Sequence, residues 1–261
     1  IRQCAAPILD EVDLSCYRMI GANYLSFKVY YTFDDQFNLH FLLLGQHKIM
    51  VSRDLWKDIF ARTISYAKAW GFKIYLQAQA PIELMFSREP IPDRTPSKLP
   101  VRGEYYVYTF ERNEVPKQKF LEQRRKEALW LAEFAEENKV DLLDPFGRFE
   151  FFPEEEFSLY KELLPQLRNR FSGKLAVVHL GLGNFEYKDY NFMFPQFNYT
   201  GFDYVTPRMY VGIYSASPLE MKEKIRELFE FADYIRRKYS VGILPMWLAE
   251  FEPCEEYKEE V

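Results

Sequence analysis

Two similar stretches of this chain determine its fold: Val140-Asp-Leu-Leu-Asp-Pro-Phe-Gly-Arg-Phe-Glu150 and Gly242-Ile-Leu-Pro-Met-Trp-Leu-Ala-Glu-Phe-Glu252. Each reads as an apolar, buried strand that runs into acidic residues at its carboxyl end. In parallel α/β proteins the functional groups gather at the carboxyl ends of the strands, because helices cover the sides of the sheet. Paired carboxylates in such a position are the groups that glycoside hydrolysis requires. The two stretches therefore predict an α/β barrel that acts on carbohydrate.

Length and composition fit one large domain. The chain has 261 residues, 48% of them hydrophobic, and a single α/β barrel has roughly 250 residues. We predict one domain over residues 1–261, with a rim insertion around 81–115 that is rich in proline. The net charge of −5 argues against nucleic-acid binding, which needs basic residues to neutralise phosphates. No apolar run approaches the roughly 20 residues of a membrane span, so we expect a soluble chain, secreted or at the cell surface rather than cytoplasmic.

Cysteine and histidine are too scattered for a metal centre or a disulfide framework. The chain has three of each, without CxxC, HxH or HxxxH spacing: Cys4, Cys16 and Cys254, and His40, His47 and His179. Zinc sites and disulfide-rich domains show closer and more regular spacings. We expect isolated buried thiols, no metal and no cofactor.

Strand and helix patterns alternate along most of the chain. Apolar and β-branched runs predict strands, and 3.6-residue periodicity predicts helices. The predicted strands are 22–31, 73–79, 140–150, 174–180, 202–210 and 242–250, and the predicted helices are 7–19, 52–70, 116–138, 153–171 and 217–239. This alternation implies parallel neighbours with right-handed crossovers. Two further strands, 37–44 and 104–110, break the rhythm, the second as part of a hairpin-like insertion.

Several segments make the similarity to a known group specific. They are Gly21–Ser26, Ala69–Gln77, Leu163–Arg168 before Lys174–Val178, and Trp247–Glu250. In these segments the chain resembles the clan A glycoside hydrolases, which are TIM (β/α)8 barrels. The resemblance covers about residues 7–253 and lacks the first and eighth strands. It implies an α/β TIM-barrel fold that is incomplete at these two strands, either because the chain is an excerpt of a longer barrel or because irregular segments close it.

The resemblance also implies a pair of catalytic carboxylates for cleavage of β-linked sugars with retention. The clan's nucleophile ends the seventh strand, which corresponds to Glu250. Its acid/base ends the fourth strand, where Gly147-Arg148 stand in place of the expected Asn-Glu pair. Arginine cannot give up its proton, so Arg148 cannot be the acid/base. Glu150, about 6–7 Å further along an extended chain, is the nearest following candidate.

Other side chains near the strand ends are candidates for substrate binding. Tyr210 is placed like the clan's tyrosine that holds the nucleophile, and Arg208 precedes it by two residues on the same strand. The remaining candidates are Arg148, His179, Gln77, Gln79, Trp247 and Tyr31. Each has a structural alternative, such as an ion pair between Arg208 and Glu250, a core position for His179, or glutamines that satisfy each other.

Three functions stay open at this point. The first is a retaining glycosidase, the second a catalytically inactive carbohydrate-binding barrel, and the third a structural or partner-binding barrel. The loop 184–199 has seven aromatic residues in sixteen, which suit stacking on sugar rings and equally suit packing on the barrel. Glu150 precedes Glu154, Glu155 and Glu156, which we expect to be a solvated first helical turn that favours the helix dipole.

Overall fold

The computed structural model describes residues 13–19, 21–34, 36–44, 48–79, 85–87, 98–101, 105–108, 115–147, 149, 152–181, 197–209 and 218–243. The chain divides into two compact units between Lys174 and Leu175. Within the ranges just given, no helix is long and apolar enough to cross a membrane.

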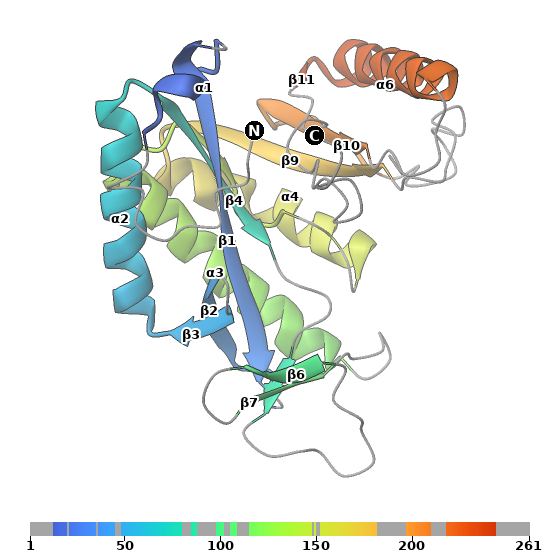
Figure 1. The fold of residues 1–261 in the computed structure, drawn as a ribbon. Coiled ribbons are helices and arrows are strands. Elements are labelled where there is room, and N and C mark those ends of the chain that lie inside the picture. Colours follow the sequence, from blue (N-terminus) through green and yellow to red (C-terminus); the bar gives the residue numbers. More distant parts are fainter. Residues whose placement is uncertain are drawn as a thin grey trace. The chain divides into compact units, whose positions relative to one another are not determined.

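Three parallel strands form the centre of the first unit. They are β1 (Tyr24–Asp34), β4 (Lys73–Gln79) and β8 (Leu142–Asp144), with β4 paired to both of the others. The long β1 runs through the middle of this unit in Figure 1. The strands predicted at 22–31 and 73–79 are therefore confirmed, and so is the parallel direction of all three. The strand predicted at 140–150 is confirmed only over Leu142–Asp144, because the chain turns directly after Asp144.

Further strands, most of them antiparallel to their neighbours, extend this sheet beside the last residues of β1. One pair continues from β1 itself: β2 (Leu39–Leu44) and β3 (Lys48–Val51). Another group begins with β5, which pairs with the last residues of β1, and consists of β5 (Met85–Ser87), β6 (Lys98–Val101) and β7 (Tyr105–Tyr108). The two extra strands expected at 37–44 and 104–110 are thus β2 and β7. The rim position of the 81–115 insertion stays a prediction.

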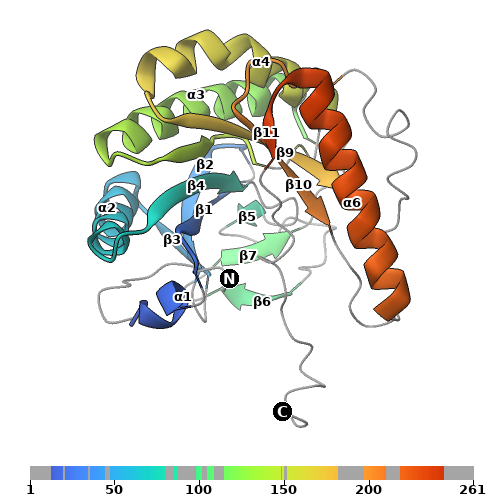
Figure 2. The same ribbon diagram turned by 90° about the horizontal axis from the view of Figure 1, so that it is seen from above.

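Helices cover one face of the parallel strands in the first unit, as the view in Figure 2 shows for α2, α3 and α4. The helices are α1 (Ser15–Met19), α2 (Arg53–Ala69), α3 (Lys117–Glu137) and α4 (Pro153–Arg170). Ser52 begins α2 as predicted, because its side chain accepts the N–H of Leu55 at 3.2 Å, a bond that satisfies a free N-terminal donor. Cys16 on the short α1 is exposed, contrary to the expected buried thiol, because this five-residue helix buries none of its residues.

An aromatic cluster joins α2 and α3 to the sheet. Trp56 stacks on Phe60 with ring centroids 4.0 Å apart and lies 5.0 Å from Phe41 of β2, while Trp130 stacks on Phe134 at 5.7 Å. Offset and edge contacts of this kind stabilise a core beyond the area that they bury. The cluster holds α2 and α3 against the sheet.

The described part of the second unit repeats the parallel pattern with three strands and one helix. The strands β9 (Lys174–Gly181), β10 (Tyr204–Met209) and β11 (Gly242–Ile243) are parallel, and α6 (Pro218–Tyr239) lies alongside β10 in Figures 1 and 2. The strands predicted at 174–180 and 202–210 and the helix at 217–239 are confirmed. The predicted strand at 242–250 is described only for its first two residues.

Candidate functional site

A row of three buried polar residues crosses the parallel strands of the first unit. Lys28 of β1 is in register with Gln77 of β4, which is in register with Asp144 of β8. Their exposed fractions are 5%, 0% and 0%. Residues in register on parallel strands lie on the same face of the sheet. We call Lys28, Gln77 and Asp144 the polar row.

The polar row lies on the face of the sheet opposite the helices. Strand residues alternate between the two faces, and the apolar positions Leu25, Phe27 and Val29, all nearly or fully buried, alternate with Lys28 along β1. Gln77 Nε2 donates to the hydroxyl of Tyr75, two residues earlier on the same face, at 3.3 Å. A buried polar group needs such hydrogen bonds to offset the loss of water.

Of the predicted substrate-binding residues, Gln77 and Tyr31 have described side chains, and the structure separates them. Gln77 belongs to the polar row. Tyr31 is fully buried on the other face of β1, where the guanidinium of Arg124 from α3 lies 5.5 Å from the centre of its ring. Its ring also meets that of Phe33 edge-on at 6.0 Å. Tyr31 therefore packs in the helix-facing layer and not beside Gln77, because it is an odd number of residues away from Lys28.

Asp144 also accepts hydrogen bonds from the residues that follow β8. Its Oδ1 accepts the backbone N–H groups of Phe146 at 3.2 Å and of Gly147 at 2.8 Å. Gly147 has φ of 60°, a left-handed conformation that glycine adopts without steric cost. Asp144 thus closes a tight turn at the start of the β8–α4 loop, the segment 145–152 that contains Arg148 and Glu150. The sequence carries a signal for this turn, an Asp followed three residues later by a Gly, but Asp144 was predicted only as part of a strand.

The first turn of α4 was expected to be solvated, but one of its three glutamates is buried. Glu154 is exposed, but Glu156 is only 1% exposed. Its Oε2 lies 3.3 Å from Nε of Arg124, and its Oε1 accepts the N–H of Phe152 at 3.0 Å. The prediction of three solvated glutamates was therefore wrong for Glu156, because the neighbouring helix α3 supplies a buried arginine.

The other predicted residues are placed only in part. Three are strand residues whose backbone alone is described: Gln79, in register with Tyr30; His179, in register with Pro207; and Arg208, in register with Leu180. His179 and Arg208 are thus one residue out of register with each other. Five lie outside the described residues: Arg148, Glu150, Tyr210, Trp247 and Glu250. The catalytic pair Glu150 and Glu250 stays a prediction.

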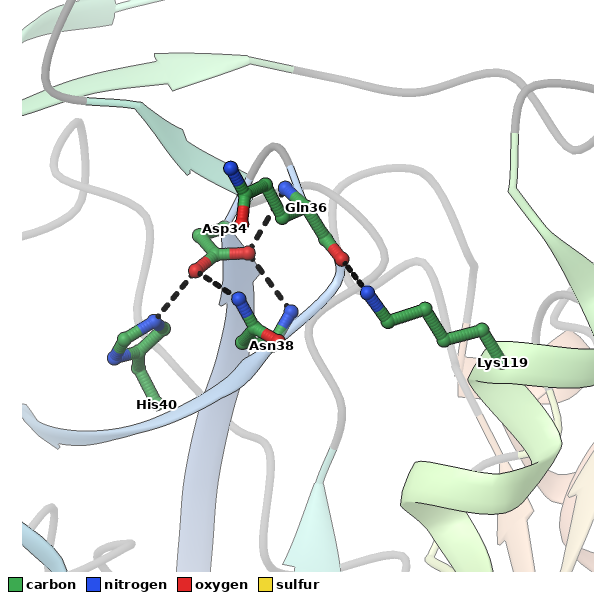
Figure 3. Close-up of polar contacts among 5 residues, drawn as sticks. All are labelled: Asp34, Gln36, Asn38, His40 and Lys119. Carbon is green, nitrogen blue, oxygen red and sulfur yellow. Dashed lines mark hydrogen bonds and ion pairs between the residues drawn. The ribbon is translucent and has the colours of Figure 1, made fainter.

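A carboxylate–imidazole pair that the sequence patterns did not predict joins the end of β1 to the start of β2 (Figure 3). Asp34 Oδ2 lies 3.1 Å from Nε2 of His40 and accepts the side-chain amide of Asn38 at 2.9 Å, and its Oδ1 accepts the N–H groups of Gln36 and Asn38. Burial raises the pKa of Asp34, but hydrogen bonds from Asn38 and His40 outweigh it and hold this pKa below its usual value. Lys119 of α3 donates to the carbonyl of Gln36. The group orders the β1–β2 turn around an ionised carboxylate.

Metal ligands do not gather among the residues that the structure describes. Within the described ranges, no three His, Cys, Asp or Glu side chains come close enough to hold an ion. The chemistry that the described residues offer is that of the polar row, a buried amine, amide and carboxylate on neighbouring parallel strands, level with the carboxyl end of β8. Such groups bind and orient polar substrates such as sugar hydroxyls.

No protein-family model and no curated protein matches this chain. Among solved structures, it is similar to a GH113 β-1,4-mannanase, with 16% identity and a TM-score of 0.52 over 88% of this chain and 62% of that one. A GH113 β-mannanase from Alicyclobacillus acidocaldarius gives 15% identity and a TM-score of 0.50 over 89% and 63%. Endo-glycoceramidase II from Rhodococcus sp. gives 11% identity and a TM-score of 0.54 over 92% and 62%.

These similarities identify the fold. The chain spans about three fifths of the length of the solved structures that it matches. Those structures are clan A glycoside hydrolases, which are TIM barrels. The chain therefore has an α/β fold of the TIM-barrel type, with an incomplete barrel, as the sequence predicted.

Proposed function

We propose that this chain is a retaining glycoside hydrolase that cleaves β-linked oligosaccharides or polysaccharides. The observation that carries the proposal is the fold, which matches glycosidases over about nine tenths of the chain. The polar row supports it, because Lys28, Gln77 and Asp144 place hydrogen-bonding groups side by side on parallel strands, level with the carboxyl end of β8, and TIM-barrel enzymes have their active sites at the carboxyl ends of their strands. The structural relatives named above act on β-linked mannan and on glycoceramide, so a β-linked glycan is the substrate class that we propose.

Two carboxylates perform the reaction in this proposal. Glu250 attacks the anomeric carbon while the carboxylic acid of Glu150 gives its proton to the departing oxygen. A water then attacks the glycosyl-enzyme ester and gives its proton to Glu150, which releases the sugar with retained configuration and restores both groups. This route needs a separation of about 5–5.5 Å between the carboxyl groups. It requires no cofactor, and Tyr210 and Arg208 are proposed to orient Glu250.

The test is the variant Glu250→Gln, compared with Glu252→Gln in the same stretch. Glutamine keeps the size and hydrogen bonding of glutamate but lacks the nucleophilic charge. We expect Glu250→Gln to lower kcat on aryl β-glycosides by several orders of magnitude with an unchanged melting temperature, and the control to retain activity. Unchanged turnover by Glu250→Gln would exclude Glu250 as the nucleophile.

The acid/base is tested by Glu150→Ala. An enzyme without its acid still cleaves substrates with good leaving groups, since these need little protonation. Added azide should then accelerate turnover by attacking the glycosyl-enzyme without the help of a base. Hydrolysis that is indifferent to Glu150→Ala on every substrate would exclude Glu150.

A carbohydrate-binding barrel without activity is the second candidate, and Gly147-Arg148 favours it because this pair replaces the expected Asn-Glu. The double variant Gly147→Asn with Arg148→Glu, which rebuilds the expected Asn-Glu pair, distinguishes the binding protein from the enzyme. Asparagine tolerates the left-handed conformation that Gly147 adopts, with φ of 60°. A wild type that binds glycans without cleaving them, and a double variant that gains hydrolysis, would support the binding protein.

A further inference from the structure

A buried ion pair joins the two ends of the β8–α4 loop. Arg124 of α3 and Glu156 of α4 are each 1% exposed, with Nε and Oε2 separated by 3.3 Å. Arg124 Nη2 donates to the carbonyl of Phe146 at the start of the loop. Glu156 Oε1 accepts the N–H of Phe152 at its end, at 3.0 Å. One ion pair thus holds both ends of the segment that contains Glu150.

Aromatic contacts fix the orientation of this pair and of the loop. The guanidinium of Arg124 lies 4.9 Å from the ring centre of Phe146, and Phe146 stacks on Tyr160 of α4 at 4.6 Å. Phe149, in the middle of the loop, is buried against Phe146 and Phe157 at 6.2 and 5.8 Å. The chain is therefore anchored on both sides of Glu150, at Phe149 and at Phe152.

Stability alone does not account for a buried pair at this place. Removing two charges from water offsets most of their attraction, so well-packed apolar residues of similar size serve a core equally well. The same two helices are also linked by Arg125 and Glu162, an exposed pair with Nη2 and Oε1 2.7 Å apart, which carries no such desolvation cost. What distinguishes Arg124 and Glu156 is their contact with the backbone of the loop.

We propose that Arg124 and Glu156 are positioning residues that fix the β8–α4 loop and thereby place the acid/base group against the glycosidic oxygen. This inference rests on the proposed function. Neither residue needs to touch the substrate, because each acts through Phe146 or Phe152. Efficient proton transfer requires the acid within hydrogen-bonding distance of the departing oxygen, so a loosened loop lowers the rate of bond cleavage and leaves substrate binding largely intact.

The test compares Glu156→Gln with the matched control Glu162→Gln, which breaks the exposed pair on the same helices. In Glu156→Gln we expect faster amide hydrogen exchange over residues 145–157, by at least about tenfold. We expect kcat to fall about 100-fold on glycosides with poor leaving groups, with little change in KM and a much smaller loss on activated aryl glycosides. Glu162→Gln should change neither exchange nor kinetics.

A second variant covers the case that Glu156→Gln does not fold, since Glu156→Gln removes the negative charge that faces the buried guanidinium of Arg124. Arg124→Met combined with Glu156→Gln removes both charges and keeps an oxygen for the N–H of Phe152. It should fold and show the same dependence on the leaving group.

Exchange and kinetics separate the possible failures. Wild-type exchange rates in the folded variant would overturn the inference, and so would an equal loss of kcat on all substrates, which indicates a purely structural function. A wild type that cleaves no glycoside refutes the proposed function instead. Faster amide hydrogen exchange of the loop in Glu156→Gln, and not in Glu162→Gln, would still show that Arg124 and Glu156 hold the loop in place.

Discussion

Glu127→Gln should remove most of the pH dependence of stability between pH 5 and pH 8. Glu127 lies on α3 and is 1% exposed, with Oε2 3.4 Å from Nη2 of Arg53. Its Oε1 has no hydrogen-bond partner among the described residues. Burial raises the pKa of Glu127, and although the charges of Arg53 and Arg124 lower it, the result is a pKa of about 7.

The sign and size of the effect follow from this pKa. In the unfolded chain the carboxyl group has its ordinary pKa of 4.5, so the folded protein binds this proton more tightly. The stabilisation is fully present below pH 4.5 and is lost as pH rises through about 7. Each pKa unit corresponds to about 1.4 kcal/mol, so the rise from 4.5 to about 7 amounts to about 3 kcal/mol. Glutamine at this position never ionises and has no such dependence.

Urea unfolding at pH 5 and pH 8 measures this difference through tryptophan fluorescence, since Trp56 and Trp130 belong to the aromatic cluster between α2 and α3. The free energy of unfolding should fall by about 3 kcal/mol more in the wild type than in Glu127→Gln. Glu133→Gln is the control, because Glu133 is exposed on the same helix and pairs with Arg170. Equal pH dependence in the wild type and in Glu127→Gln would refute the reasoning.

Two further predictions concern the turns at the strand ends. Asp34→Asn should destabilise the β1–β2 turn at neutral pH. Because the pKa of Asp34 is lowered, the stability that its carboxylate contributes is present above the ordinary pKa and is lost as pH falls through the lowered value. The melting temperatures of the wild type and the variant should therefore differ at neutral pH and become equal in acid. Gly147→Ala should lower stability by roughly 1–2 kcal/mol because φ is 60° there, and Gly147→Asn should lower it less. Thermal unfolding measures both variants, and an equal loss of stability in the two would contradict the left-handed turn.

Much of the architecture could be predicted because its signals are local. The N-cap at Ser52 and the periodicity of the segment after it determine where α2 begins, and the strand predicted at 73–79 agrees with β4 to the residue. The alternation of strands and helices then leads to parallel neighbours, since a helix between two strands returns the chain in the same direction. These properties depend on residues a few positions apart, and the sequence displays them directly.

The sequence by itself thus determined the order and direction of the parallel strands and of the helices between them, but only the tertiary structure decided which polar side chains are buried. Glu156 and Glu154 stand in the same helical turn and have the same local signals, yet Arg124 buries one and water surrounds the other. Tyr31 and Lys28 lie on opposite faces of β1 because of their odd spacing, but only the packing of α3 shows that the face of Tyr31 meets the helices. The physical reason is that a buried charge or ring depends on a partner from a distant segment, whose position no local pattern records.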